Sequence, residues 1–203
     1  MMRSALAPLL ALLAACSGSA SYEHEGTTES TGGRGDYVSD GAKQVVKGEI
    51  EEAIRLFTIA INHNPRRDDA YYHRALAKQQ IMDIDGSIDD LSEAVRVNTH
   101  NARAWFKRGW LHHNHRADYQ QARLDYTRAI EEDPGYSDAY YHRGLTYQAL
   151  GVYVSAIADM DKALRVAPVG WSFSEQAQRD LAICRRQSNV QGFAEDPKPI
   201  NPR

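Results

Sequence analysis

The sequence predicts an all-α protein: a right-handed solenoid of four helix-turn-helix repeats that ends in a C-terminal capping helix. The octapeptide DAYYHRAL at residues 69–76 returns as DAYYHRGL at residues 138–145, a distance of two 34-residue units plus one residue. Alanine also recurs at the twenty-seventh position of every unit, as Ala60, Ala94, Ala129 and Ala163. A single helix pair cannot bury its apolar face alone, so such units are expected to stack on one another.

The first fifteen residues, MMRSALAPLLALLAA, are typical of a signal peptide, with Arg3 ahead of an apolar run. That run is shorter than the roughly 20 residues that a membrane-spanning helix needs. Leu13-Ala14-Ala15-Cys16 resembles the lipobox of bacterial lipoproteins, and this resemblance implies that Cys16 is lipidated and becomes the first mature residue. Ser17 then favours the outer membrane. An ordinary signal peptide cleaved near Ala15 is the alternative.

Residues 16–33 and 188–203 have compositions that favour a flexible tether and a disordered tail. The first segment is rich in Ser, Thr, Gly and Glu, and the second has three prolines in its last seven residues. The formal net charge of the whole chain is −3. This charge provides no basic surface for nucleic acid, so nucleic-acid partners are not expected.

The repeats are expected at residues 34–67, 68–101, 102–136 and 137–170, with one extra residue of the third unit inside HHNHRAD. Small residues at the eighth and twentieth positions allow two helices to approach closely, and large residues at the fourth and twenty-fourth positions fill the space beside them. Proline ends the second helix at Pro65, Pro134 and Pro168, whereas the second unit has Thr99 there.

A capping helix is expected at residues 171–187. Ser172 and Glu175 have the spacing of a capping box at its start. Phe173, Ala177, Leu181 and Cys184 form one apolar face, which predicts that Cys184 is a core residue and not a reactive thiol.

These repeated positions resemble the tetratricopeptide repeat family. The resemblance implies that the first helix of each unit lines a concave groove, and it places nine candidate protein-binding residues there: Tyr72, His73, Leu76, Phe106, Lys107, Trp110, Tyr141, His142 and Leu145. Aromatic residues are enriched in binding hot spots. The alternative is that Tyr72, Phe106 and Tyr141 pack one repeat against the next. The family's clamp for chaperone tails uses Lys and Asn residues, and this chain has mainly His and Leu at those sites.

Arginine at the seventh position and aspartate at the twenty-third occur together in three units and are both absent from the first. Positions seven and twenty-three of two antiparallel helices lie at similar heights, which predicts an ion pair in each unit. The predicted pairs are Arg74 with Asp90, Arg108 with Asp125, and Arg143 with Asp159. A basic ladder for acidic ligands is the alternative.

His112, His113 and His115 raise the possibility of a zinc site, but a closed site needs four ligands, and no local residues supply the rest. A polar turn is the favoured interpretation. No catalytic motif is present, so we expect neither enzymatic activity, nor a cofactor, nor a small-molecule substrate. The sequence predicts a lipid-anchored adaptor for other proteins of a bacterial envelope, in the outer membrane facing the periplasm. A metal-dependent or enzymatic module that uses the histidines is the alternative.

Overall fold

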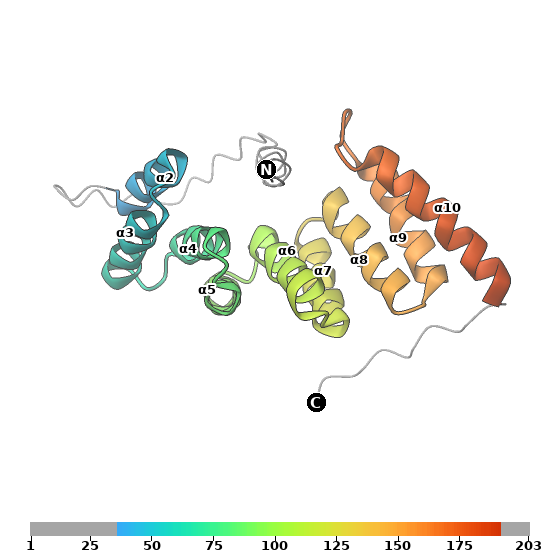
Figure 1. The fold of residues 1–203 in the computed structure, drawn as a ribbon, viewed down its shortest axis with the longest axis horizontal. Coiled ribbons are helices and arrows are strands. Elements are labelled where there is room, and N and C mark those ends of the chain that lie inside the picture. The colour runs from blue at the N-terminus through green and yellow to red at the C-terminus, as the bar shows by residue number, and fades with distance from the viewer. Residues whose placement is uncertain (1–35, 192–203) are drawn as a thin grey trace, which may run out of the picture. The chain divides into compact units, whose positions relative to one another are not determined.

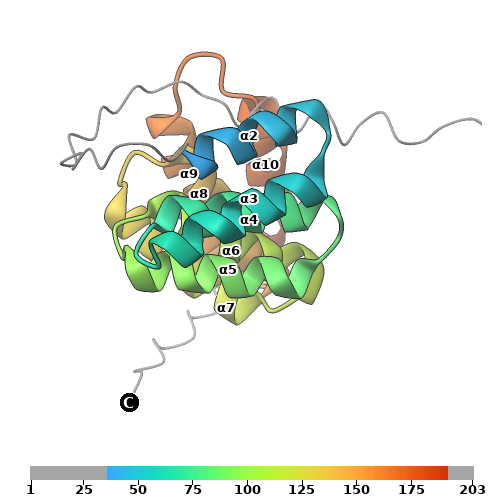
Figure 2. The same cartoon turned by 90° about the vertical axis from the view of Figure 1, so that its left-hand side faces the viewer.

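The computed structural model describes residues 36–191, and this part of the chain is entirely helical apart from its turns (Figures 1 and 2). The helices follow one another as neighbours, and each packs on the next. Their bounds are α2 Tyr37–Lys47, α3 Ile50–His63, α4 Asp68–Gln80, α5 Ile84–Val97, α6 Ala102–Leu111, α7 Tyr119–Glu132, α8 Ser137–Ala149, α9 Tyr153–Val166 and α10 Ser174–Gln191. The expected signal peptide, Cys16 and the whole expected tether lie outside the described residues, as does the chain after Gln191.

Polar caps start several of these helices. Asp83 accepts a hydrogen bond from the Gly86 amide at the start of α5, and Asp118 accepts one from the Gln121 amide at the start of α7. Asn101 does the same for α6. Each cap satisfies one of the amide groups that a first helical turn leaves without a backbone partner.

The second helices of the first three repeats end in the same way, whether or not a proline follows. Asn64, Asn98 and Asp133 all adopt extended backbone, with φ between −132° and −143° and ψ between 92° and 96°. Asn98 precedes Thr99 and not a proline, yet its geometry matches. Its amide group donates to Asp68 at 3.0 Å, so a hydrogen bond supports the turn where proline is missing.

Close approach within each helix pair depends on the small residues. A Cβ atom placed on Gly109 would lie 3.1 Å from the Asp125 Cβ and 3.1 Å from the Tyr126 ring. Ala75 is fully buried at the corresponding position of α4. The large residues beside these contacts, such as Phe57 and Tyr126, are also fully buried. The expected division between small contact residues and large filling residues is therefore present.

The extra residue of the third repeat forms a π-helical turn, η1, at His112–Arg116 between α6 and α7. The turn ends at Ala117, which has a φ of 50°, and the Asp118 amide donates to the His112 carbonyl at 3.0 Å. Single π-helical turns are the usual way for a helix to absorb one inserted residue. The insertion is thus contained in the turn, and α6 still packs along α7.

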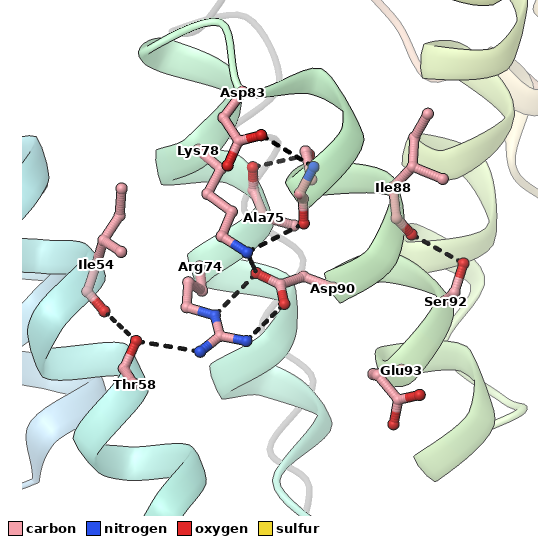
Figure 3. A network of polar contacts seen from close by, with 12 residues as sticks. Ile54, Thr58, Arg74, Ala75, Lys78, Asp83, Ile88, Asp90, Ser92 and Glu93 are labelled. Atoms are coloured by element: carbon pink, nitrogen blue, oxygen red, sulfur yellow. Dashed lines mark hydrogen bonds and ion pairs between the residues drawn. The ribbon is translucent and has the colours of Figure 1, made fainter.

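Each position-seven arginine binds the aspartate of its own repeat through two hydrogen bonds. Nε and Nη2 of Arg74, Arg108 and Arg143 donate to both carboxylate oxygens of Asp90, Asp125 and Asp159 at 2.6–3.0 Å. Figure 3 shows the first of these pairs, in which Lys78 also contacts Asp90. The arginine side chains are 14–17% exposed and the carboxylates 1–10%, so these are buried ion pairs.

The same arginines also reach the preceding repeat. Nη1 of Arg74 donates to the Thr58 hydroxyl of α3 at 3.1 Å, and that hydroxyl donates to the Ile54 carbonyl (Figure 3). Ser92 and Thr127 serve Arg108 and Arg143 in the same way. We call this set of contacts the arginine ladder. Each rung joins a first helix to the second helices on both of its sides.

The capping helix α10 differs from the expected one at both ends. It begins at Ser174, and the Ala177 amide donates to the Phe173 carbonyl, so Phe173 and not Ser172 occupies the capping position. The expected capping box is therefore wrong. The helix continues to Gln191, so residues 188–191 belong to it and not to a tail. Ala177, Leu181 and Cys184 are buried against α8 and α9, as expected, and burial raises the pKa of the Cys184 thiol to about 11.

We predict that Arg108 and Asp125 are energetically coupled. Asp125 is 1% exposed, so replacing Arg108 with alanine should leave a buried carboxylate without its main partner and cost about 3–5 kcal/mol of unfolding free energy. A double-mutant cycle to alanine, measured by urea unfolding, should give a clearly non-zero interaction energy. The matched cycle on the exposed pair Arg128 and Glu131 should give at most about 1 kcal/mol. Additive effects at Arg108 and Asp125 would contradict the pairing.

Candidate protein-binding surface

Two of the predicted groove residues are core residues. Phe106 is 4% exposed, and its ring centroid lies 5.7 Å from that of Tyr126, 5.0 Å from that of Tyr136 and 5.4 Å from that of His142. It therefore fills the boundary between the third and fourth repeats. The prediction that Phe106 presents its ring to a partner is wrong, because its surface is already covered by the neighbouring repeat.

Tyr141 occupies the equivalent place between the fourth repeat and α10, and it is 3% exposed. Its hydroxyl donates to Asp180 of α10 at 2.7 Å, and its ring contacts those of Trp171 and Phe173. Burial raises the pKa of Tyr141. The predicted binding role of Tyr141 is wrong for the same reason as that of Phe106, since position five of these helices faces the next first helix.

Position nine remains partly exposed along the same side of the first helices. Leu76 of α4, Trp110 of α6 and Leu145 of α8 are each partly buried, and Trp110 and Leu145 pack against the core. We call these three residues the position-nine line. Tyr72 of α4 is also partly buried against the core of the first repeats. Of the predicted aromatic strip, Tyr72 and Trp110 therefore still have accessible surface.

Two cations beside this line take no part in the ion pairs of the described residues. Arg103 and Lys107 of α6 form no ion pair within residues 36–191. The charge of Arg103 acts on His73 of α4, and that of Lys107 acts on Asp138 and His142 of α8. Arg103 and Lys107 thus lie where α6 faces its neighbours.

The carboxylates of the same region are already hydrogen-bonded inside the protein. Asp69 receives two hydrogen bonds from Arg67, at 3.0 and 2.7 Å. Asp138 accepts a hydrogen bond from the Trp171 indole N–H, and burial raises the pKa of Asp138. With these acids bound internally and the cations available, the surface around the position-nine line favours an anionic partner.

His73 and His142 mainly pack at the boundaries between repeats and are only partly exposed. The His73 ring stacks on Phe57 of the preceding repeat at 5.8 Å, and the His142 ring stacks on Tyr126 at 6.0 Å. Burial lowers the pKa of both, and that of His142 falls to about 3, with smaller contributions from the charges of His113 and Lys107. Both imidazoles are therefore neutral at pH 7.

The histidine run does not converge on one point. The Nδ1 atom of His113 lies 2.9 Å from the Thr146 hydroxyl, whereas the His115 ring packs on Trp110. His112 keeps a buried Nδ1 atom without a hydrogen-bond partner. Within residues 36–191, no group of three or more His, Cys, Asp or Glu side chains is placed to bind a metal ion. None of the helices in this part of the chain is long and apolar enough to span a membrane.

Sequence reasoning missed the accessible residues of α10, because it addressed only the core face of that helix. Ile183 is 43% exposed and Val190 is 82% exposed. A helical wheel of residues 174–191 would have separated these two from Ala177, Leu181 and Cys184. The hydroxyls of the arginine ladder were missed as well, although Thr58, Ser92 and Thr127 share the twenty-fifth position of their units.

Two family models, both described as tetratricopeptide repeat, match residues 82–137 and 125–158. Tetratricopeptide repeat protein 6 of Homo sapiens is 31% identical over 131 residues, which is 64% of this chain and 25% of that protein. Tetratricopeptide repeat protein 36 of Danio rerio is 32% identical over 98 residues, 46% of this chain and 52% of that protein. The chain thus spans about a quarter to a half of the length of these relatives.

Solved structures show the same fold. A crystal structure of MamA matches with a TM-score of 0.60 at 22% identity, covering 74% of this chain and 95% of that one. The first TPR of Spaghetti (RPAP3), bound to an HSP90 peptide, matches with a TM-score of 0.53 at 24% identity and covers 56% of this chain and 90% of that one. The chain therefore contains tetratricopeptide repeats and folds as an all-α solenoid of them.

We predict that Phe106→Ala lowers the unfolding free energy more than Trp110→Ala does, because Phe106 is a core residue and Trp110 is partly exposed. Phe106→Ala opens a cavity between repeats and should cost about 3–5 kcal/mol of unfolding free energy. Trp110→Ala removes a half-open side chain and should cost clearly less. Urea unfolding followed by helical circular dichroism gives both values. Equal losses would mean that Trp110 is as much a core residue as Phe106.

We predict that His142 makes the protein less stable in acid. Its folded pKa of about 3 lies below the ordinary 6.5, so between these values the unfolded chain binds a proton that the folded chain does not. Unfolding free energy should therefore fall as pH drops through 6.5, by up to about 2 kcal/mol from His142 at pH 5. His142→Gln should flatten this dependence in melts from pH 7.5 to 5, whereas the exposed His115→Gln should not. An unchanged slope in His142→Gln would contradict the assignment.

Proposed function

We propose that this chain is a lipid-anchored adaptor of a bacterial cell envelope that binds a protein partner along the first helices of its repeats. The repeat fold supports an adaptor role, because tetratricopeptide arrays display a series of equivalent helices to one partner. The envelope machineries that such an adaptor would scaffold are peptidoglycan enzymes, outer-membrane assembly factors, and secretion or pilus complexes.

The observation that carries the binding proposal is the position-nine line. Leu76, Trp110 and Leu145 occupy equivalent places on three successive first helices, and each is partly exposed. A folded core has no need for exposed apolar surface that repeats in register. Tryptophan is among the residues most enriched in binding hot spots, so Trp110 is the expected anchor.

A similar fold with a bound peptide supports this proposal. The first TPR of Spaghetti (RPAP3) is bound to an HSP90 peptide in its solved structure, so an array of this kind can hold a short segment. We propose a segment of comparable length as the partner here. The chemistry of the present surface differs from a Lys and Asn clamp, because it presents Leu76, Trp110 and Leu145 beside Lys107 and histidines.

The membrane anchor is proposed from Cys16, which lies outside the described residues. The lipobox-like sequence before it supports diacylation, and more than one acyl chain is needed for stable anchoring. An anchor of this kind would hold the repeats at the membrane surface, within reach of other envelope proteins. The outer membrane is proposed from Ser17, because aspartate at that position favours retention at the inner membrane.

We predict that Trp110→Ala weakens partner binding by about 2 kcal/mol or more, because anchors of this kind contribute most of the binding energy. The measurement is the affinity for partners recovered from membranes with the lipidated protein, after circular dichroism has shown an intact fold. Leu124→Ala, a change at an exposed apolar residue of α7, is the matched control and should bind normally. Normal binding by Trp110→Ala would place the contact elsewhere.

We predict that Cys16→Ser moves the protein from the membrane fraction to the soluble fraction, because the acylated residue is removed. Fractionation followed by mass spectrometry of the N-terminus gives the result and shows whether the signal has been cleaved. If a cleaved serine variant still sedimented with membranes, Cys16 lipidation would not be the anchor.

A further inference from the structure

We propose that α10 forms the last wall of the binding surface, and that this surface recognises an acidic amphipathic helix. The inference deepens the proposed function and rests on it. It assigns to α10 a role beyond capping, and it names the chemistry of the partner.

The rotation of α10 is fixed by two kinds of contact. Ala177, Leu181 and Cys184 are buried toward α8 and α9, and Asp180 accepts the hydrogen bond of the Tyr141 hydroxyl from α8. Asp180 therefore marks the side of α10 that meets a first helix. At 3.6 residues per turn, Ile183 follows Asp180 on the side away from Leu181 and Cys184.

The position-nine line continues onto this side of α10. Helices α8 and α10 are separated by one antiparallel helix, so they run in the same direction (Figure 1). One turn beyond the contact of Tyr141 with Asp180, Leu145 on α8 and Ile183 on α10 therefore lie at the same height. Within the repeats, the position-nine line ends at Leu145. Ile183 extends this line onto α10.

The exposed residues of α10 are more apolar than a capping helix requires. Ile183 is 43% exposed, and Val190, two turns further along the same side, is 82% exposed. The outer face of a terminal helix is normally polar, because it replaces the next repeat with solvent. Gln178, which points away from this side, fits that rule, but Ile183 and Val190 do not.

Positive charge flanks these apolar residues. Arg179 and Arg186 lie on the same side of α10, and Arg186 forms no ion pair with any residue in 36–191. Arg179 has an exposed ion pair with Glu175 at 3.5 Å and donates to the Gln176 side chain at 3.2 and 2.8 Å. Asp180, a buried acid of α10, is already engaged by Tyr141 and by Gln176.

These two features together define the partner that fits. An apolar line crossed by separate helices suits the apolar stripe of a partner helix, which repeats every three or four residues. The cations Arg103, Lys107, Arg179 and Arg186, beside carboxylates that are already occupied, call for Glu or Asp on the flanks of that stripe. The required charges are those of side chains, so a free C-terminal carboxylate is not needed.

The experiment uses the full-length lipidated protein in detergent and a fluorescent synthetic peptide of roughly 18 residues, about five helical turns. The peptide carries Leu along one stripe and Glu on both flanks, and its C-terminus is amidated. A second peptide has Lys in place of every Glu. Affinities are measured by fluorescence anisotropy at low and at physiological salt, with protein-free detergent as the blank.

We expect the acidic peptide to bind and the basic one to bind at least ten-fold more weakly. Arg179→Glu/Arg186→Glu and Ile183→Asp should each weaken binding of the acidic peptide at least ten-fold. The control is Arg128→Glu/Arg165→Glu, which makes the same charge change at exposed residues of α7 and α9 and should leave the affinity unchanged. Circular dichroism melts check that every variant is folded.

The other outcomes separate the two proposals. If Trp110→Ala loses binding while both α10 variants keep it, the position-nine line binds the partner, and the extension of the surface onto α10 is overturned. If the α10 variants and Trp110→Ala all bind normally, the proposed binding surface itself is wrong. Equal binding of the acidic and basic peptides would overturn the partner chemistry.

If deletion of residues 192–203 raised the affinity ten-fold, the chain's own Glu195 and Asp196 segment would be the occupant, and the proposal of an external partner would be overturned.

Discussion

The arginine ladder is the constraint on which the arrangement of the repeats depends. Each position-seven arginine is bound to a carboxylate of the following helix and to a hydroxyl of the preceding one, as Arg108 is to Asp125 and Ser92. The ring three residues earlier adds a further contact, since the Arg108 guanidinium lies 4.7 Å from the centroid of Trp105. A buried guanidinium can satisfy all of these partners in one register only, and a shifted helix would leave an unpaired buried charge. The ladder therefore sets the height of each first helix against both neighbours.

That register decides which residues of the first helices stay accessible. With positions four, seven and eight turned toward the second helices, position five faces the next first helix, where Phe106 and Tyr141 are buried. Position nine lies one turn further along, past these covered rings, and it is left partly open at Trp110 and Leu145. The position-nine line and the ladder thus occupy different sides of the same helices. For this reason, variants of the surface can be tested without breaking the buried ion pairs.

Comparing the repeats of one sequence predicts only the features that recur in each repeat. This accounts for both the correct and the wrong predictions. The helix pairs and the Arg–Asp pairs recur in register, so their joint appearance and absence identified them. The burial of Phe106 and Tyr141 depends instead on Tyr136, Trp171 and Phe173, which lie in turns or at a helix start. An apolar residue at position five is expected both where it contacts a partner and where it packs on a neighbouring repeat, so its residue type does not separate the two cases. Only the placement of those turn residues distinguishes the two.

The ends of the ladder explain why α10 presents the face that it does. In the first repeat, position seven is Asp40, which pairs with Lys43 of its own helix at 2.7 Å on the surface and has no ion pair with another helix between residues 36 and 191. In the fourth repeat, position twenty-five is not a hydroxyl residue but Asp161, and no position-seven arginine follows it. Arg185 of α10 donates to Asp161 at 3.2 Å instead, in a more exposed pair than those of the ladder. Arg185 and Asp180 thus hold α10 from the two edges of its buried face, one toward α9 and one toward α8. The buried face of α10 and these two contacts set its rotation, and this rotation leaves Ile183 exposed.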